Sequence, residues 1–417
     1  MDDKILDWQV ESRTQHIIKV IGVGGGGGNA VNHMYKEGIH DVSFAICNTD
    51  NQALLDSPIK VKVQLGKNTT GGLGAGNKPE VAFEAAEESI SQLQQLMSDG
   101  TRMVFITAGM GGGTGTGAAP VVARVAKELN ILTVGIVTIP FAFEGPRKIL
   151  QALKGVEEIA KHVDALLVIN NERIRDIYLD WTLPSAFAKA DETLATAAKS
   201  IAEIITIKGI INVDFADVNT TLKDGGVAIM STGLASGPNR VDDAIKNALH
   251  SPLLNSHDVF SAKKILINLW YDKSEPPIVE ELNPLHNFLS KFSPDVDVIW
   301  GVSAVDGLGD NVKVTLLTTG FSIADVPEIG EHRKEASRAE KLEQQAQEEA
   351  KREEERKNRE KIKEYYGERV AKSVTTSLRL EPFVLSLDEL DDDKIIDALS
   401  MPIFKRDREF NPHTASA

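Results

Sequence analysis

Six short apolar runs, rich in β-branched residues, recur between residues 15 and 183 and alternate with stretches of helical spacing. The runs are IIKVIGVG, VSFAICNTD, VKVQLG, MVFITAG, LTVGIVTIPF and ALLVINN. Runs of this kind are typical of strands buried on both faces, and their alternation with helices is typical of a parallel sheet. We therefore expect an α/β domain over residues 15–183, with a parallel sheet that helices cover on both sides.

The sequence after residue 183 predicts a long helix and then a second α/β domain. Between residues 184 and 209 the apolar side chains are spaced three or four apart, as one buried helical stripe requires; they include Leu194, Ala197, Ile201, Ile204 and Ile205. After a loop and helix at 210–224, four more strand-like runs follow: GVAIMSTG, KKILINLWYD, VDVIWGVSA and VKVTLLTTGF. With amphipathic helices near 240–249 and 279–292, they predict a smaller α/β domain over residues 225–323.

Both ends of the chain differ in composition from these domains. We expect residues 1–14 to be disordered and residues 324–379 to form a charged linker, in which residues 331–363 are nearly all Glu, Lys, Arg, Gln and Ala. Without an apolar stripe to bury, this segment is either a solvated helix or a fluctuating coil. Residues 380–417 mix acidic and apolar side chains, and a short apolar segment after a polar tether is typical of a partner-binding peptide.

Charge and composition exclude several classes of protein. The chain carries 46 Lys and Arg against 61 Asp and Glu, a formal charge of -15, so we expect no direct nucleic-acid binding. No apolar run reaches about 18 residues and the N-terminus lacks a secretory pattern, which predicts a cytoplasmic protein without direct membrane insertion. A single cysteine, Cys47, and the absence of metal-binding histidine spacings argue against a disulfide or a protein-held metal site.

The first apolar run leads into a glycine-rich segment, Gly22 to Asn29, after which a helix is expected from Ala30 to Glu37. Free backbone amides and a helix N-terminus at one point favour a bound phosphate. Gly22, Gly24 and Gly27 also match GxGxxG, with Asp50 at the end of the next strand, so a dinucleotide-dependent oxidoreductase is an alternative. A third interpretation is a glycine-rich turn that serves close packing only.

A second glycine-rich segment, Gly109 to Gly117, follows the fourth strand run and precedes the expected helix AAPVVARVAKEL. Its Thr114 and Thr116 hydroxyls add hydrogen-bond donors to those of the backbone, which suits several phosphate groups in a row. A third segment, Gly72 to Gly76, could approach a terminal phosphate through its backbone. The sequence has no GxxxxGK[ST] motif, so it is not a P-loop enzyme, and the second segment has no place in the oxidoreductase interpretation.

The segment GGGTGTG resembles the signature of the tubulin/FtsZ superfamily, in the form that bacterial cell-division members carry. Further motifs agree in order along residues 17–321: KVIGVGGGGGNAV, CNTD, GLGAG, GMGGGTGTGAAPVVA, PFAFEGPRK, NNER, FAKADETL and NVDFADV. The resemblance implies an α/β fold with a Rossmann-like GTPase domain of the tubulin type, a long central helix, a second smaller α/β domain and a charged flexible tail. It also implies a GTPase that polymerises head to tail as the scaffold of the division ring.

The same resemblance implies that GTP or GDP binds at the glycine segments. Residues of these segments would hold the phosphates, Glu144 and Lys148 would meet the ribose region, and Asn29, Phe187 and Asp191 would read the guanine. The expected nucleotide-binding residues are Gly25, Gly26, Gly27, Gly28, Asn29, Asn48, Ala75, Gly112, Gly113, Thr114, Gly115, Thr116, Glu144, Lys148, Phe187 and Asp191.

Two of these assignments have simpler alternatives or depart from the family. Without the resemblance, Asp191 on an amphipathic helix is a solvated side chain. Where the family usually ends its FEGxxR motif with arginine, this chain has Arg147 followed by Lys148. The change keeps the positive charge but alters which side chain can make a bidentate contact.

Asn212, Asp214 and Asp217 lie in the motif NVDFADV. From spacing alone, the two aspartates are a helix N-cap and a favourable acid in the first helical turn. The resemblance implies instead that this loop enters the nucleotide pocket of the next subunit, where Asp214 and Asp217 polarise the water that attacks the γ-phosphate and Asn212 lies beside them. Hydrolysis would then follow assembly, with Mg²⁺ held mainly by phosphates and water. A non-hydrolysing scaffold relative is a further alternative, which the presence of both aspartates argues against.

The tail contains Met401, Pro402, Ile403 and Phe404, followed by two basic residues. This segment resembles the family's C-terminal peptide, which binds membrane-tethering division proteins such as FtsA. We expect Pro402 and Phe404 to anchor the peptide in a partner groove; the alternative is a disordered terminus with chance apolar residues. The resemblance also implies self-association into a homopolymer and a ring at the division site.

Overall fold

The computed structural model describes residues 16–39, 41–177, 182–250 and 259–323, together with Arg356, Lys357 and Glu360. The chain divides into two compact units, residues 1–334 and residues 335–417. In the second unit Arg356, Lys357 and Glu360 are helical and exposed. The expectations for residues 1–14, for most of the linker and for the peptide at 401–404 lie outside the described residues.

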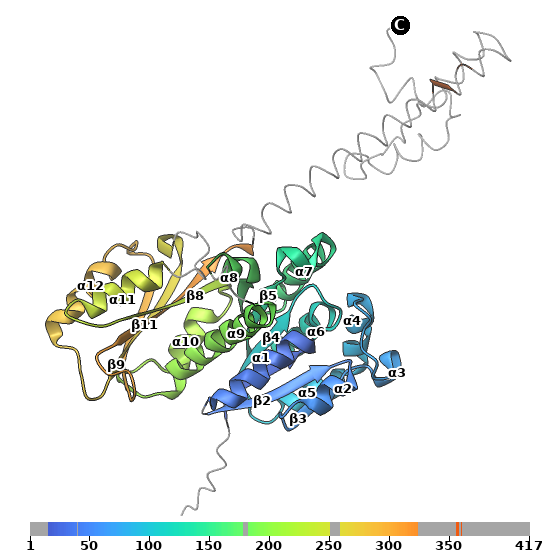
Figure 1. The fold of residues 1–417 in the computed structure, drawn as a ribbon, viewed down its shortest axis with the longest axis horizontal. Coiled ribbons are helices and arrows are strands. Elements are labelled where there is room, and N and C mark those ends of the chain that lie inside the picture. Colours follow the sequence, from blue (N-terminus) through green and yellow to red (C-terminus); the bar gives the residue numbers. More distant parts are fainter. Residues whose placement is uncertain are drawn as a thin grey trace, which may run out of the picture. The chain divides into compact units, whose positions relative to one another are not determined.

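One sheet runs through the whole first unit (Figure 1). Its spatial order is β3-β2-β1-β4-β5-β6-β8-β11-β9-β10-β7. The strands are β1 (Ile18–Val23), β2 (Val42–Asn48), β3 (Val61–Gln64), β4 (Met103–Gly109), β5 (Leu132–Ile139), β6 (Ala165–Asn170), β7 (Gly209–Ile211), β8 (Gly226–Ala235), β9 (Lys264–Asp272), β10 (Asp297–Val305) and β11 (Val312–Phe321). Strands β1 to β6 pair in parallel, which confirms the predicted parallel sheet.

The N-terminal and C-terminal halves of the unit share this sheet. Strands β6 and β8 pair in parallel through three residue pairs, beginning with Ala165 and Gly226. Beyond this junction β11 runs antiparallel to both β8 and β9, and β7 runs antiparallel to β10. The two expected α/β regions are therefore joined by backbone hydrogen bonds as well as by the central helix.

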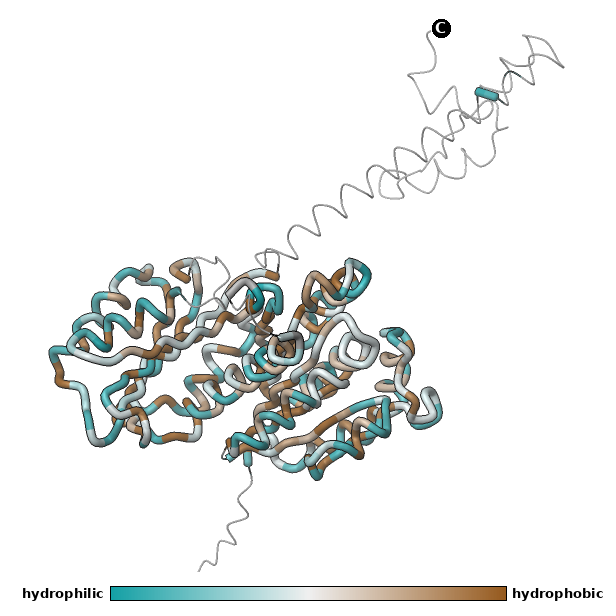
Figure 2. The backbone as a smooth tube through the Cα atoms, in the orientation of Figure 1, coloured by the Kyte–Doolittle hydropathy of each residue, from teal (hydrophilic) through white to brown (hydrophobic). Residues whose placement is uncertain are grey.

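Helices cover both faces of the sheet, and each face has its own hydrophobic core. The described helices are α1 (Gly24–Glu37), α2 (Asn51–Asp56), α3 (Lys67–Thr70), α4 (Pro79–Glu88), α5 (Ile90–Met97), α6 (Thr114–Glu128), α7 (Pro146–Ala160), α8 (Asn171–Ile177), α9 (Leu183–Thr206), α10 (Phe215–Leu222), α11 (Arg240–Leu249) and α12 (Asn283–Leu289), with short 3-10 turns η1 (Ala142–Glu144), η3 (Val259–Ser261) and η4 (Val279–Leu282). Helices α4 to α7, α11 and α12 contribute to one core, and α1, α2 and α8 to α10 contribute to the other. Figure 2 shows many apolar residues along the strands and hydrophilic residues on the outer helices. None of the described helices is long and apolar enough to cross a membrane.

The glycine segments are more helical than predicted. Helix α1 begins at Gly24 rather than Ala30, and α6 begins at Thr114, within the second glycine segment. Glycine has a low helix propensity, but packing overrides it here. A Cβ atom on Gly27 would lie 2.1 Å from the carbonyl oxygen of Thr107, and one on Gly117 would lie 2.0 Å from that of Pro79. These helices approach neighbouring backbone so closely that only glycine fits.

Two smaller expectations are also wrong. Strand β3 was predicted to be buried, but it lies at the edge of the sheet and Val61 is 47% exposed. The helix expected at 279–292 is split into η4 and α12. Pro284 lies at the start of α12, where it is tolerated because the first N–H groups of a helix need no helical partner.

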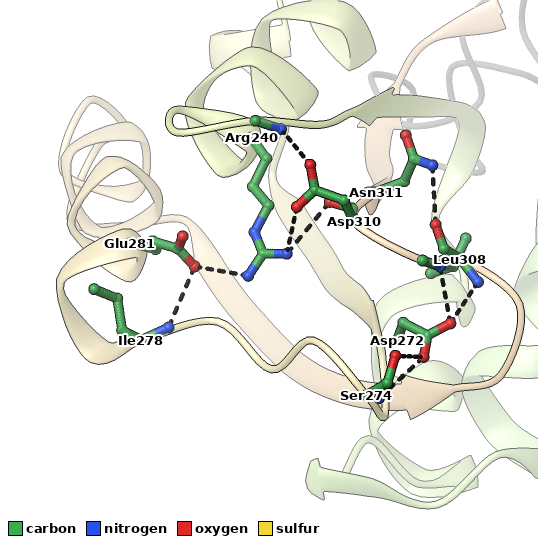
Figure 3. A network of polar contacts seen from close by, with 10 residues as sticks. Arg240, Asp272, Ser274, Ile278, Glu281, Leu308, Asp310 and Asn311 are labelled. Atoms are coloured by element: carbon green, nitrogen blue, oxygen red, sulfur yellow. Dashed lines mark hydrogen bonds and ion pairs between the residues drawn. The ribbon is translucent and has the colours of Figure 1, made fainter.

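A polar network holds the turn between β10 and β11 (Figure 3). At the end of β9, Asp272 accepts hydrogen bonds from the N–H groups of Gly307, Leu308 and Gly309, at 2.8–2.9 Å, and from the N–H and hydroxyl of Ser274. These bonds, that from the Ser274 N–H first, hold the pKa of Asp272 well below its usual range. The network stabilises the turn between β10 and β11 against the end of β9, in the C-terminal half of the unit.

Candidate functional site

The two long glycine segments meet at the carboxyl ends of β1 and β4. Strands β1 and β4 are parallel neighbours, so their carboxyl ends lie together, and α1 and α6 begin there. A Cβ atom on Gly24 would lie 2.9 Å from the backbone nitrogen of Gly115, and one on Gly26 would lie 3.2 Å from the Cα of Gly109. The predicted convergence of the two segments is confirmed.

Both helix N-termini at this point are suited to an anion. Val23 precedes α1 and Gly113 precedes α6, and neither side chain caps its helix; neither first turn contains an acidic residue. The first N–H groups of a helix have no helical acceptor, and the N-terminus carries a partial positive charge. Two such ends in contact form a concentrated set of donors for phosphate oxygens.

Open space lies over selected glycines. A Cβ atom on Gly25, Gly28 or Gly112 would meet no atom within 4 Å. A cavity of about 40 Å³ is lined in part by Gly25, Gly28, Asn29 and Asn48, which brings these four predicted residues together. It is too small for a whole nucleotide, so a bound nucleotide would extend beyond it over the surface.

The third glycine segment closes around the start of α6. A Cβ atom on Gly113 would lie 3.0 Å from that of Ala75, and the hydroxyls of Thr49 and Thr114 are 2.8 Å apart. Sequence analysis missed Thr49; its position after the buried Asn48 at the end of β2 was the available signal. Thr116 is buried, and its hydroxyl accepts a hydrogen bond from the Gly111 N–H at 2.9 Å, which stabilises the turn before α6. Its place in nucleotide binding stays a prediction.

Asp50, which the oxidoreductase interpretation required, is engaged by its own helix. Its carboxylate accepts hydrogen bonds from the N–H groups of Gln52, at 2.9 Å, and Ala53, at 3.4 Å, and so caps α2. A carboxylate used in this way is a helix cap. The feature that most favoured a ribose-binding acid therefore has a local structural explanation.

Aromatic side chains gather where the guanine is expected. The rings of Phe141 and Phe143 are stacked with centroids 5.0 Å apart, and Phe187 of α9 contacts both edge-on. Phe143 and Phe187 remain 53% and 40% exposed, so their faces are available to a flat ligand. Phe143 was missed by sequence analysis, although it lies within the PFAFEGPRK motif.

Asp191 lies one helical turn after Phe187, on the same face of α9. Burial raises the pKa of its carboxyl to about 6, which marks it as more than a solvated side chain. Glu144 and Lys148 form an ion pair with each other at 3.3 Å, and Glu144 also accepts a hydrogen bond from the Phe141 N–H. Their mutual contact keeps both beside the aromatic cluster.

Asn212, Asp214 and Asp217 surround the start of α10. Asp214 caps the helix by accepting hydrogen bonds from the N–H groups of Ala216 and Asp217, and Asp217 accepts one from the Asp214 N–H at 2.9 Å. Asn212 accepts a hydrogen bond from the Gly209 N–H. Asp214 and Asn212 are exposed and Asp217 is half-buried. The cap predicted from spacing alone is thus present, and it places the two carboxylates together at the start of α10.

These aspartates lie near the amino end of β4, whereas the glycine segments lie at its carboxyl end. The guanidinium of Arg102 lies 5.0 Å from the centroid of the Phe215 ring, next to Asp214 in sequence. Arg102 immediately precedes β4, whereas Gly109 ends it, and the seven residues of this strand span about 20 Å. Helix α9 separates the two regions in the same way, since its 24 residues are about 36 Å long. One chain cannot bring Asp214 and Asp217 to its own glycine segments.

Comparison with known proteins identifies this architecture. The model of the Tubulin/FtsZ family, GTPase domain, matches residues 17–179, and that of the FtsZ family, C-terminal domain, matches residues 226–322. The chain is 51% identical to the cell division protein FtsZ of Porphyromonas gingivalis over 416 residues, which cover 97% of this chain and 89% of that protein. The chain belongs to the FtsZ family.

Other relatives agree with this assignment. The cell division protein FtsZ of Aquifex aeolicus is 44% identical over 306 residues, which cover 73% of this chain and 83% of that protein. An empty FtsZ dimer from M. jannaschii has a TM-score of 0.68 at 39% identity, covering 74% of this chain and 89% of that one. CetZ1 from Haloferax volcanii, a GDP-bound monomer, shares the fold with a TM-score of 0.67 at 22% identity.

Membership of the FtsZ family establishes the general activity. The chain is a GTPase that binds guanine nucleotide and a GTP-dependent polymerising protein of cell division, and it associates with itself. The oxidoreductase alternative is thereby excluded. The roles of individual residues and the way in which subunits combine are inferred from the geometry of the site.

Proposed function

We propose that the GTPase site is completed only between two subunits, with the glycine segments of one chain facing Asp214 and Asp217 of the next. The observation that carries this proposal is the separation of the two regions by the full length of β4. A head-to-tail contact would bring the face of one subunit that carries its glycine segments against the face of its neighbour that carries Asp214 and Asp217. Such a heterologous contact does not close on itself and so generates a filament.

Within the shared site, the two faces have different tasks. The uncapped starts of α1 and α6 hold the phosphates, with Thr49 and Thr114 beside them. Phe187 and Phe143 provide flat surfaces for the guanine, and Asp191 accepts hydrogen bonds from its N1–H and exocyclic amine. Asp214 and Asp217 of the next subunit orient and polarise the attacking water, with Asn212 beside them.

We further propose that Mg²⁺ accompanies the nucleotide. Among the described residues no group of three or more His, Cys, Asp or Glu side chains could hold a metal ion. This donor set fits an ion held mainly by phosphate oxygens and water, as Mg²⁺ prefers. When bound, the ion offsets the phosphate charge that develops during hydrolysis.

Replacement of Asp217 by asparagine separates its two possible roles. The asparagine side-chain oxygen can still accept the hydrogen bond from the Asp214 N–H, so α10 keeps its cap, but the negative charge is lost. We expect GTP binding and thermal stability to match those of the parent chain, while turnover per assembled chain falls by about 10² or more. Unchanged turnover in assembled protein would remove Asp217 from the mechanism and leave it as a cap.

Assembly dependence is tested by measuring GTP turnover per chain against protein concentration, with right-angle light scattering from the same sample. We expect both signals to begin at the same threshold concentration. Turnover that stays constant per chain below and above the threshold would contradict a shared site. Scattering without turnover would favour a non-hydrolysing scaffold.

We infer a division of labour along the chain. Residues 15–183, together with Phe187 and Asp191 of α9, bind GTP; the segment 184–209, which contains α9, connects them to the catalytic loop and helix at 210–224; and residues 225–323 form a C-terminal domain. The two family matches, to residues 17–179 and 226–322, support these boundaries. The charged linker at 324–379 would give reach to the tail at 380–417.

The tail peptide is proposed to bind a membrane-tethering division protein such as FtsA, and so to bring the cytoplasmic filament to a ring at the division site. The sequence Met401-Pro402-Ile403-Phe404, followed by two basic residues, supports this assignment. A chain that ends at residue 380 should keep its GTPase activity and lose binding to the tether, and Phe404→Ala should weaken that binding. Full binding by the shortened chain would overturn the proposal.

A further inference from the structure

Asp164 lies where the two halves of the sheet join. It immediately precedes β6, and the pairing of β6 with β8 begins at the next residue, Ala165, opposite Gly226. The backbone carbonyl of Asp164 accepts a hydrogen bond from the Gly226 N–H at 3.1 Å, and its backbone N–H donates one to the Thr133 carbonyl at 2.8 Å. Asp164 is therefore fixed between β5 of the N-terminal half and the start of β8.

The side chain of Asp164 is fully buried and takes part in two ion pairs. One carboxylate oxygen, Oδ2, accepts a hydrogen bond from the Thr133 N–H at 2.9 Å. The other, Oδ1, lies 3.0 Å from the Nζ of Lys223 and 3.4 Å from the Nζ of Lys127. Within the described residues Oδ1 accepts no hydrogen bond, so the two ammonium groups compensate its charge. Because an uncompensated buried charge is costly, this contact holds both lysines in place.

The two lysines lie at the ends of the two helices that carry the shared site. Lys127 is in the last turn of α6, whose start is proposed to hold the phosphates. Lys223 follows directly after α10, whose start carries Asp214 and Asp217. Helix α10 has eight residues and is about 12 Å long, so a shift of its end is carried to its start. One buried carboxylate therefore contacts the ends of both helices.

Helix α10 depends on Asp164 more than α6 does. Among the ion pairs of the described residues, Lys127 has a second partner, Asp224, at 3.6 Å, whereas Lys223 pairs with Asp164 alone. The start of α6 is also fixed separately, by the close backbone packing at Gly117. Loss of the Asp164 charge should therefore displace α10 and leave the phosphate-binding end of α6 in place.

We propose that Asp164 is a positioning residue for GTP hydrolysis: through Lys223 it fixes the placement of α10, and with it the two catalytic aspartates. The inference rests on the proposed shared site, because the aspartates that Asp164 positions serve the nucleotide of the next subunit. Loss of Asp164 therefore impairs hydrolysis of the neighbour's nucleotide and spares hydrolysis of the nucleotide that its own chain holds. A residue needed only for folding would affect both.

Mixtures of two full-length chains separate these effects. The nucleotide-supplying chain carries Asp214→Ala and Asp217→Ala. The aspartate-supplying chain carries Gly25→Val, which adds a side chain where the phosphates are expected. Asp164→Asn is then placed in one chain or in the other. The asparagine oxygen can still accept the hydrogen bond from the Thr133 N–H, but the charge is lost.

The two placements of Asp164→Asn should give different results at saturating GTP and equal scattering. In the aspartate-supplying chain it should lower the turnover of the mixture by about fivefold or more, since small misplacements of catalytic groups are costly. In the nucleotide-supplying chain it should lower turnover by less than about twofold, because the aspartates of that chain are already absent. The second placement is the matched control for a general loss of stability, and GTP binding below the assembly threshold checks folding.

Lys223 provides an independent test at the surface. Its side chain is 45% exposed, so variants at this position should fold even if Asp164→Asn does not. In the aspartate-supplying chain, Lys223→Gln should reproduce the loss of turnover, whereas Lys223→Arg should keep most of the activity because the charge remains. If the two residues act together, Asp164→Asn combined with Lys223→Gln should be no worse than either change alone.

The possible outcomes separate this inference from the shared site itself. Equal losses from both placements of Asp164→Asn, or no loss from either, would overturn the proposal, as would full turnover with Lys223→Gln. A mixture without changes at residues 164 and 223 that shows no turnover would instead contradict the shared site, and the inference would fail with it.

Discussion

Replacement of Asp191 by alanine should abolish the preference of this chain for GTP over inosine triphosphate. The inosine base keeps the N1–H group of guanine but lacks the exocyclic amine. If the Asp191 carboxylate accepts hydrogen bonds from both groups, the parent chain loses one of them with inosine triphosphate. A hydrogen bond to a charged group contributes about 1.5–3 kcal/mol, which corresponds to a preference for GTP of about 10- to 100-fold.

The alanine variant has no acceptor for either group, so its two dissociation constants should be nearly equal. The assay is equilibrium binding of both nucleotides to the parent and variant chains, measured below the assembly threshold by isothermal titration calorimetry. Reporting a ratio within each protein cancels general losses of affinity. An undiminished preference for GTP in the variant would refute the assignment of Asp191 to the guanine.

The pH dependence of binding provides a second measure of the same contact. Burial raises the pKa of Asp191 to about 6 in the nucleotide-free chain, and the guanine donors require the ionised form. The affinity for GTP should therefore have its full value above this pKa and decrease as the pH drops through it. At pH 5 it should be about tenfold lower than at high pH. The alanine variant should lack this component, and an identical pH profile in both proteins would contradict it.

Two further predictions concern packing and stability. Gly27→Ala should destabilise the fold by about 1–3 kcal/mol or prevent folding, because its Cβ would lie 2.1 Å from the Thr107 carbonyl oxygen. Gly28→Ala meets no atom within 4 Å, so this variant should fold normally but bind GTP more weakly. Urea denaturation and GTP binding of both variants check this, and equal losses of stability would contradict it. Asp191→Asn should stabilise the nucleotide-free chain at pH 7 by about 1–2 kcal/mol, since the raised pKa means that the ionised carboxylate opposes folding. At pH 4, close to the pKa of the unfolded chain, only about a fifth of this advantage should remain. Thermal unfolding at the two pH values measures it, with an advantage independent of pH as the contrary result.

The sequence predicted the strands well because most of them are buried and rich in apolar, β-branched residues, whether they run parallel or antiparallel. The runs from β1 to β6 and from β8 to β11 are all confirmed, and α11 has the predicted bounds. The starts of α1 and α6 were predicted too late, because glycine suppresses the local helical signal while contacts with Thr107 and Pro79, distant in sequence, impose the helix. Such contacts leave no periodic trace in the sequence.

The candidate site, too, could be predicted only in part from the sequence. The convergence of the glycine segments followed from strands in parallel order, and the residues of the family motifs followed from the resemblance. Thr49 and Phe143 were missed because their relevance comes from Thr114 and Phe187, which only the fold brings near. The capping geometry of Asp214 and Asp217 was predicted from their spacing. Their distance from the glycine segments became known only from the arrangement of the strands in the sheet.

The shared site is tested most directly by mixing two inactive chains. One carries Asp214→Ala and Asp217→Ala and keeps its glycine segments. The other carries Gly25→Val, which places a side chain over the first glycine segment, at a position where a Cβ atom meets no protein atom within 4 Å. We expect each chain alone to have little GTP turnover and the mixture to regain a substantial part of it, because the nucleotide of the first chain meets the aspartates of the second. Turnover of the mixture no greater than the sum of the two separate chains would contradict a site formed between subunits.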